Sequence, residues 1–120
     1  MLVIRRSQQV VAPGYFCFPG GGLEPGESET EALVRELREE LNCEITPVRR
    51  LWENVSRWKI HLAWWQASLV EGTVVVPNPL EVESAHWLSP AEIGAMPNVL
   101  DGNREFVASL LRGEIGLDLR

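Results

Sequence analysis

The residues best suited to chemistry are acidic and lie in one short segment. Eight Glu and two Arg occur between Glu24 and Glu44, a net charge of −6, and the whole 120-residue chain also has a formal net charge of −6. Glu39 and Glu40 follow Glu36 by three and four residues, so on a helix the three carboxylates share one face. Like charges at this spacing cost about 0.2 to 0.5 kcal/mol per pair. We therefore expect a bound cation to neutralise them.

The ligand type indicates which cation this would be. Carboxylates with no His or Cys nearby suit hard cations that take oxygen ligands, Mg²⁺ first, with Mn²⁺ or Ca²⁺ as competitors. Arg35 offers another way to balance the charge, because it is spaced four residues from both Glu31 and Glu39. Taken alone, the helix is better explained as a salt-bridged face exposed to solvent.

A glycine-rich loop before the helix changes this interpretation. Three consecutive glycines in Pro19-Gly20-Gly21-Gly22 exclude a regular element. The loop would present backbone amides and carbonyls beside the acidic face, an arrangement that a pyrophosphate and its Mg²⁺ can use. The loop and the helix together therefore favour a metal-assisted phosphate site.

The spacing of these residues resembles a known motif. Gly21, Glu27 and the run Arg35-Glu36-Leu37-Arg38-Glu39-Glu40-Leu41 resemble the Nudix box, Gly-x5-Glu-x7-Arg-Glu-U-x-Glu-Glu-x-Gly-U, where U is a bulky apolar residue. Asn42 replaces the second glycine of the motif, and Cys43 is a rather small apolar residue for its position. Asn is the next-best residue for φ > 0, so the turn should survive. The sequence is thus identified as MutT-like, a member of the Nudix hydrolase family, although the box covers only 23 residues.

The resemblance implies roles for the box residues. Arg35 and Glu27 would orient the metal ligands, although a salt bridge that stabilises the loop explains Glu27 equally well. The implied ligands are the carboxylates of Glu36, Glu39 and Glu40 and the carbonyl of Gly20.

The general base is expected either in the box or in a later loop. Glu39 is the preferred candidate. Glu81 and Glu83, in the loop before Trp87, are the alternatives, and for both of them simple exposure to solvent is the favoured interpretation.

The resemblance further implies Mg²⁺-dependent hydrolysis of a nucleoside diphosphate linked to another group, with a nucleoside triphosphate or dinucleotide as the default substrate. Metal-activated water would attack phosphorus. One alternative is a catalytically inactive Nudix-fold domain that binds nucleotides or has a regulatory role. Another is a calcium-binding or purely structural acidic helix, which the lack of an EF-hand loop weakens.

Hydrophobic patterning predicts an α/β protein in which a mixed β-sheet is sandwiched between α-helices, built as a single domain over residues 1–120. A capping box at Ser28 starts the acidic helix, and Asn42 ends it. The last helix should bury Phe106, Val107, Leu110 and Leu111. The predicted strands are Leu2 to Arg6, Tyr15 to Phe18, Ile45 to Trp52, Lys59 to Leu69, Thr73 to Val76 and Ser84 to Leu88, and the predicted helices are Ser28 to Leu41, Pro90 to Ala95 and Asp101 to Leu111.

Composition excludes several classes of protein. With 45% hydrophobic and 23% charged residues, and no long apolar run, the chain is expected to be cytoplasmic and not to bind membranes. It lacks the basic face that binding a nucleic-acid backbone requires. Cys17 and Cys43 have no spacing that indicates a disulfide framework or a zinc site, and the two His are assigned no chemistry. The family's usual leading strand is expected to be short or missing, so an open sheet edge could pair in a homodimer.

Five Trp are numerous for this length. Trp64 and Trp65 are adjacent in a predicted strand, so they point to opposite faces and at least one should lie in the core. Trp58 could stack on a nucleobase, although core packing is the better interpretation of any single Trp.

Overall fold

The strands form two antiparallel sheets in the computed structural model, which describes residues 1–118. One sheet has the order β2-β1-β5 and the other pairs β3 with β4. The elements follow in the order β1 (Leu2–Arg6), β2 (Phe16–Cys17), α1 (Glu29–Leu41), β3 (Ile45–Val55), β4 (His61–Leu69), β5 (Val82–Trp87), α2 (Pro90–Ala95) and α3 (Asp101–Leu111).

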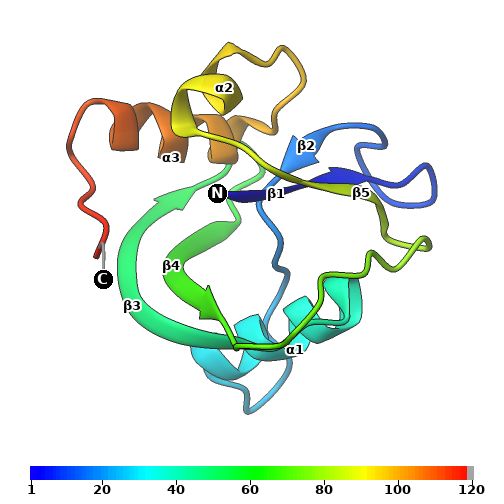
Figure 1. Cartoon of the computed structure of the whole chain (residues 1–120). Coiled ribbons are helices and arrows are strands. Elements are labelled where there is room, and N and C mark those ends of the chain that lie inside the picture. Colours follow the sequence, from blue (N-terminus) through cyan, green and yellow to red (C-terminus); the bar gives the residue numbers. More distant parts are fainter. Residues whose placement is uncertain (119–120) are drawn as a thin grey trace.

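The sheets lie between helices. Figure 1 shows α1 on one side of the strands and α2 and α3 on the other. The named strand pairs are antiparallel, and an isolated parallel bridge joins Phe16 to Val99. The predicted α/β architecture, with β-structure sandwiched between helices, is confirmed. No helix among residues 1–118 is long and apolar enough to cross a membrane.

Local signals set both ends of α1. The Ser28 hydroxyl accepts from the Glu31 amide while the Glu31 carboxylate accepts from the Ser28 amide, which forms the predicted capping box. Asn42 adopts the left-handed conformation at φ 51°, as its position in the motif requires. The helix buries Leu37 and Leu41 against a core that also contains Ile4, Cys17, Cys43 and Val82. This packing fixes the orientation of the acidic face.

A second core lies under α2 and α3. Phe106 and Val107 of α3 pack there with Val3 and Ile93. The Trp64 ring stacks on Phe106 with centroids 4.4 Å apart, so the prediction that at least one of the adjacent Trp packs in the core holds. The predicted burial of Leu111 is wrong, because its side chain is 55% exposed. Other hydrophobic residues packed against this core include Val99, Ile115, Trp52, Leu88 and Leu110.

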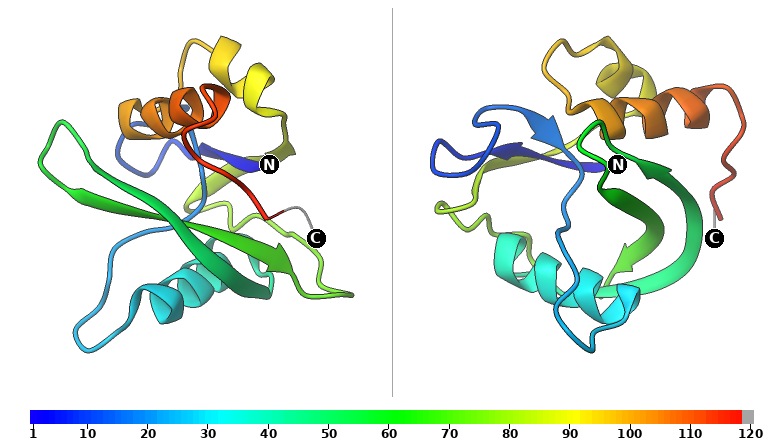
Figure 2. Two further views of the ribbon diagram at one scale, coloured as in Figure 1. Left: turned by 90° about the vertical axis from the view of Figure 1, so that its left-hand side faces the viewer. Right: turned by 180° about the vertical axis from the view of Figure 1, so that it is seen from behind.

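The predicted strand Thr73 to Val76 is not formed. Its amides are used elsewhere: Thr73 donates to the Val70 carbonyl and Val76 donates to the Leu41 carbonyl. The Asn42 side chain also donates to the Val76 carbonyl, at 2.7 Å. The Val76 amide therefore binds the free Leu41 carbonyl at the end of α1 and not a carbonyl of another strand. Figure 2 shows the segment as an extended connection between the β3–β4 hairpin and β5.

Candidate functional site

The glycine-rich segment crosses from the three-stranded sheet to α1 (Figure 1). At its start the Phe18 amide donates to the Asn103 carboxamide oxygen at 2.8 Å, and the Phe18 ring packs edge-on against Phe106. Asn103 is buried at the start of α3, and no local sequence pattern indicates its role because its partner is 85 residues away. The contact anchors the segment just before Gly20.

Glu40 of α1 binds the backbone of this glycine-rich segment. Its carboxylate accepts a 2.8 Å hydrogen bond from the Gly20 amide, and the residue is only 8% exposed. Burial raises the pKa of Glu40 to about 8, and the nearby charges of Glu36 and Glu81 act in the same direction, while Arg6 opposes them. A buried carboxyl that favours its neutral form is poised to exchange its proton for a cation.

Glu36 lies directly against the next glycine. A Cβ built on Gly21 would come within 2.5 Å of the Glu36 carboxyl carbon and one of its oxygens. Burial raises the pKa of Glu36, and the Arg35 guanidinium partly offsets that effect. Glycine is therefore required at position 21 for space, because any side chain would displace this carboxylate.

Arg35 contacts several carboxylates of the acidic cluster. Its guanidinium binds both oxygens of Glu27, at 2.7 and 2.9 Å, and donates to the Gly22 carbonyl at 2.9 Å. It also reaches Glu36 at 2.9 Å and Glu39 at 3.2 Å. These contacts lower the pKa of Glu27 to about 2, chiefly through the hydrogen bond from Arg35, and raise that of Arg35. The predicted pairing of Arg35 with Glu27 is present.

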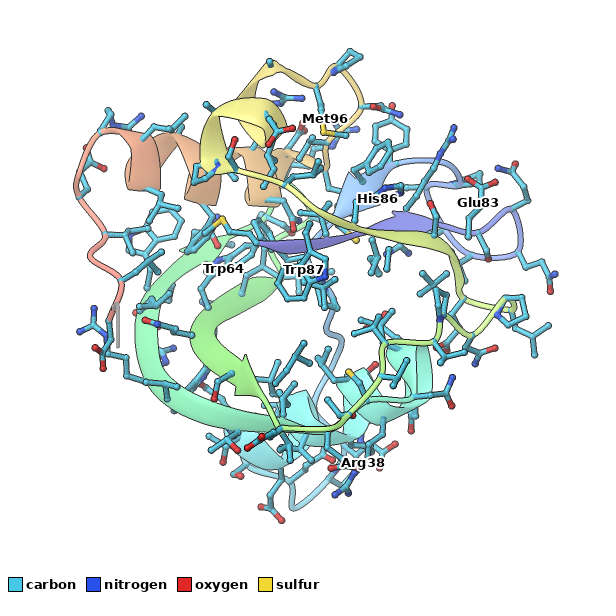
Figure 3. All side chains as sticks on the ribbon, viewed as in Figure 1. Arg38, Trp64, Glu83, His86, Trp87 and Met96 are labelled. Carbon is cyan, nitrogen blue, oxygen red and sulfur yellow. The ribbon has the colours of Figure 1, made fainter. Side chains whose placement is uncertain are left out.

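The three box carboxylates of α1 have different surroundings. Glu40 faces Gly20, Glu36 lies against Gly21, and the Glu39 side chain is 49% exposed beside Arg35. Among residues 1–118, no three His, Cys, Asp or Glu side chains converge closely enough to hold a metal ion as they stand. Arg35 instead neutralises part of the charge of Glu36 and Glu39. Figure 3 shows Arg38 on the side of α1 that faces away from the sheets.

Glu81 and Glu83 have different environments. Glu83 forms a 3.1 Å ion pair with Arg5 and is largely exposed. Glu81 is partly buried; its Oε2 is shielded from solvent and has no hydrogen-bond partner among residues 1–118, and its charge acts on both Glu36 and Glu40. The expectation of simple solvent exposure is therefore wrong for Glu81. The structure adds this fourth carboxylate to the cluster from the turn before β5.

Comparison with known proteins identifies the family. The model of the family described as "NUDIX domain" matches residues 1–110. The chain belongs to the Nudix family. The predicted assignment as a Nudix hydrolase, an enzyme that acts on pyrophosphate bonds, is confirmed, and enzymes of this family use divalent metal ions.

Two relatives and one solved structure illustrate the similarity. CTP pyrophosphohydrolase of Escherichia coli is 39% identical over 95 residues, which cover 77% of this chain and 68% of the relative. NAD-capped RNA hydrolase NudC of Stutzerimonas stutzeri is 31% identical over 96 residues, and the match spans 80% of this chain but only about a third of that protein. The MutT protein of Methanosarcina mazei superposes with a TM-score of 0.72 at 22% identity, over 94% of this chain and 83% of that one, which shows the shared fold.

Proposed function

We propose that this chain is a single-domain hydrolase that uses Mg²⁺, with Mn²⁺ as a possible substitute, to cleave the pyrophosphate bond of a nucleotide. The observation that carries the proposal is the buried Glu40 carboxyl, which lies within electrostatic range of both Glu36 and Glu81. Three carboxylates so enclosed repel one another unless protons or a cation intervene. A divalent cation at this point would relieve the repulsion.

The donor set fits a hard cation. Its members offer only oxygen, from Glu36, Glu39, Glu40 and the Gly20 carbonyl, and Glu81 adds a buried oxygen that has no hydrogen-bond partner in the described part of the chain. Oxygen-only sets suit Mg²⁺ and Mn²⁺. Arg35 would have to release Glu36 and Glu39, whereas its two-point contact with Glu27 can persist. Glu27 would then keep the guanidinium beside the site without competing with the ligands.

When bound, the cation supplies charge neutralisation at the pyrophosphate oxygens and lowers the pKa of a coordinated water. The protein residues do the rest. Gly20 to Gly22 let the backbone approach the phosphates closely, and Arg35 offers a further positive charge to them. Glu39, more exposed than Glu36, accepts the proton of the attacking water. Glu81 is the alternative acceptor, and Glu83 is set aside because Arg5 holds it elsewhere.

The proposed substrates are nucleoside triphosphates and dinucleotides. The names of the relatives specify CTP and NAD-capped RNA, so CTP and NAD⁺ are the first compounds to test. The site is acidic, and the excess negative charge of the chain lies around it. It would therefore recognise a metal-bound polyphosphate and not a long nucleic-acid backbone, which requires a basic surface.

The test is hydrolysis of a nucleotide and dinucleotide panel with Mg²⁺ or Mn²⁺, measured as released phosphate or pyrophosphate. Glu39→Gln and Glu40→Gln should each lose most of the activity, while Arg38→Gln, whose guanidinium pairs with Glu44, should retain it. Absence of turnover, with nucleotide binding retained, would instead support a catalytically inactive binding domain. Turnover unchanged in both Glu variants would refute this site.

A further inference from the structure

Asn78 lies in the segment between β4 and β5 and contacts the end of α1 at two points. Its backbone amide donates to the Glu40 carbonyl at 2.8 Å, and its side-chain amide donates to the Glu39 carbonyl at 3.2 Å. The last carbonyls of an α-helix have no partner within the helix, so both bonds satisfy acceptors that α1 leaves free. Figure 1 shows this segment passing the C-terminal end of α1 on its way to β5. Asn78 therefore attaches the segment to two residues that carry box carboxylates.

Asn78 also forms the turn that carries Glu81. Its side-chain oxygen accepts from the Leu80 amide at 3.2 Å. Its backbone carbonyl accepts from the amides of Glu81 and Val82, at 3.0 and 2.8 Å. An Asn side chain that binds the backbone two residues ahead is a common turn-forming arrangement. The carboxamide of Asn78 thus binds the helix through its nitrogen and the turn through its oxygen.

Two hydrogen bonds connect the backbones of Glu40 and Glu81 through Asn78. The Asn78 amide binds the Glu40 carbonyl, and the Asn78 carbonyl binds the Glu81 amide. The Oε2 atom of Glu81 is shielded from solvent and has no hydrogen-bond partner among residues 1–118. Because no hydrogen bond holds this oxygen, its position depends on the backbone of the turn. The contacts of Asn78 therefore determine where the Glu81 carboxylate lies relative to the acidic face of α1.

The other side of the turn is attached to β1. The Ser7 hydroxyl donates to the Leu80 carbonyl at 2.9 Å, and the Ser7 amide donates to the Glu81 carbonyl at 3.1 Å. Ser7 follows β1 directly and is buried. These bonds fix the turn against the three-stranded sheet. They do not contact α1, so the spacing between the turn and the helix depends on Asn78.

We propose that Asn78 is a positioning residue that holds Glu81 against the carboxylates of α1 and so completes the metal site. The inference rests on the proposed function, since it takes Glu81 as a participant in metal binding. Asn78 would touch neither the metal nor the nucleotide, and it would act through Glu81. Loss of a group that orients a metal ligand typically weakens metal affinity by about 10- to 100-fold.

The experiment measures the dissociation constant of Mn²⁺ by titration calorimetry and the Mg²⁺ requirement of hydrolysis. Asn78→Ala loses both side-chain bonds and should weaken Mn²⁺ binding by about 10- to 100-fold. Asn78→Asp keeps the acceptor for the Leu80 amide and loses the donor to the Glu39 carbonyl. Its added negative charge would by itself attract a cation, so weaker Mn²⁺ binding in this variant identifies the lost donor as the cause. The Mg²⁺ requirement should rise in both variants.

A double variant tests whether Asn78 acts through Glu81. If it does, Asn78→Ala combined with Glu81→Gln should bind Mn²⁺ about as tightly as Glu81→Gln alone. Asn42→Gly is the matched control, because it removes a 2.7 Å bond from the same helix end to the Val76 carbonyl. Glycine keeps the left-handed cap that Asn42 forms. This control should lower the melting temperature and leave the Mn²⁺ dissociation constant unchanged.

Several results would overturn the proposal. They are unchanged Mn²⁺ binding in Asn78→Ala or in Glu81→Gln, additive losses in the double variant, or an equal loss in Asn42→Gly. If Asn78→Ala does not fold, Asn78→Asp provides the same comparison. A wild type that binds Mn²⁺ but hydrolyses no nucleotide would refute the proposed function, while the calorimetric comparison would still decide the role of Asn78. A wild type that binds no Mn²⁺ would overturn both.

Discussion

The Gly20 amide donates to the Glu40 carboxylate across 2.8 Å, and this hydrogen bond joins the glycine-rich segment to the acidic helix. The bond stabilises the charged form of Glu40, yet burial outweighs it and raises the pKa to about 8. Near neutral pH the metal-free protein therefore holds a proton at this position. The same carboxyl links the stability of the protein to pH and to metal binding.

The metal-free protein should lose stability as the pH rises from about 5 to about 8. Glu40 has a higher pKa in the folded state than in the unfolded chain, so between the two values the native state binds the extra proton. Its stabilising contribution is complete below the unfolded pKa and is lost as the pH rises through the folded value. The slope for one proton is at most about 1.4 kcal/mol per pH unit. Urea unfolding in EDTA at several pH values measures it.

Glu40→Gln is the control for this linkage, because it keeps the size of the side chain and cannot ionise. Its stability should depend less on pH over that range than the wild type's. Adding Mg²⁺ to the wild type at pH 7 should raise the melting temperature and release protons into a weakly buffered solution. A stability that increases from pH 5 to 8 in EDTA would contradict the burial of this carboxyl.

Gly21→Ala should reduce kcat/KM by about 10- to 100-fold, a size typical of displacing a catalytic group by about 1 Å. The added Cβ would meet the Glu36 carboxylate at 2.5 Å, so the side chain must move. Gly116→Ala, in the segment after α3, is the matched control, since a Cβ there meets only the Arg49 side chain at 3.9 Å. Steady-state kinetics of the two variants, with melting curves to verify folding, measure the difference. Equal activities would show that the position of Glu36 does not matter.

Glu27→Gln should lower metal affinity or turnover by about 10- to 100-fold, as loss of a group that orients metal ligands does. The amide cannot accept both guanidinium hydrogen bonds, so Arg35 would shift toward Glu36 and Glu39 and compete with the cation. Glu24→Gln is the control, because Glu24 contacts the same guanidinium only at 3.7 Å and is mostly exposed. Mg²⁺ titrations of activity at saturating nucleotide separate the two variants. If Glu27→Gln changed only the melting temperature, Glu27 would have a purely structural role in the loop.

The sequence was sufficient where the determining signals were local. Ser28 and Asn42 mark the ends of α1, and the spacing of Arg35 to Glu39 predicted a contact that the structure contains. Each of these signals acts within a few residues or along a single helix. These signals could therefore be recognised in the sequence without knowledge of any tertiary contact.

The remaining features depend on distant partners. Asn103 meets Phe18 across 85 positions, and the partial burial of Glu81 depends on where the turn before β5 packs. Thr73 to Val76 has a strand-like sequence, but the free carbonyls at the end of α1 compete successfully for its Val76 amide. The direction of each box carboxylate is also a tertiary property, because Arg35 and two glycine backbones determine it. The spacing of Glu36, Glu39 and Glu40 predicted that they share one helix face. It did not show that the Glu40 carboxylate is buried.

Glu81→Gln should reduce kcat/KM by at least about tenfold, whereas Glu83→Gln should leave it nearly unchanged. The two residues are close in sequence and carry the same charge, but only Glu81 is electrostatically coupled to Glu36 and Glu40, and only Glu83 is held by Arg5. A metal ligand would show mainly as a higher Mg²⁺ requirement in Glu81→Gln, and a general base as a lower kcat with a changed pH–rate profile. Equal effects of the two variants would remove Glu81 from the site. A defect confined to Glu83→Gln would mean that the Arg5 pair, and not the buried oxygen, supports catalysis.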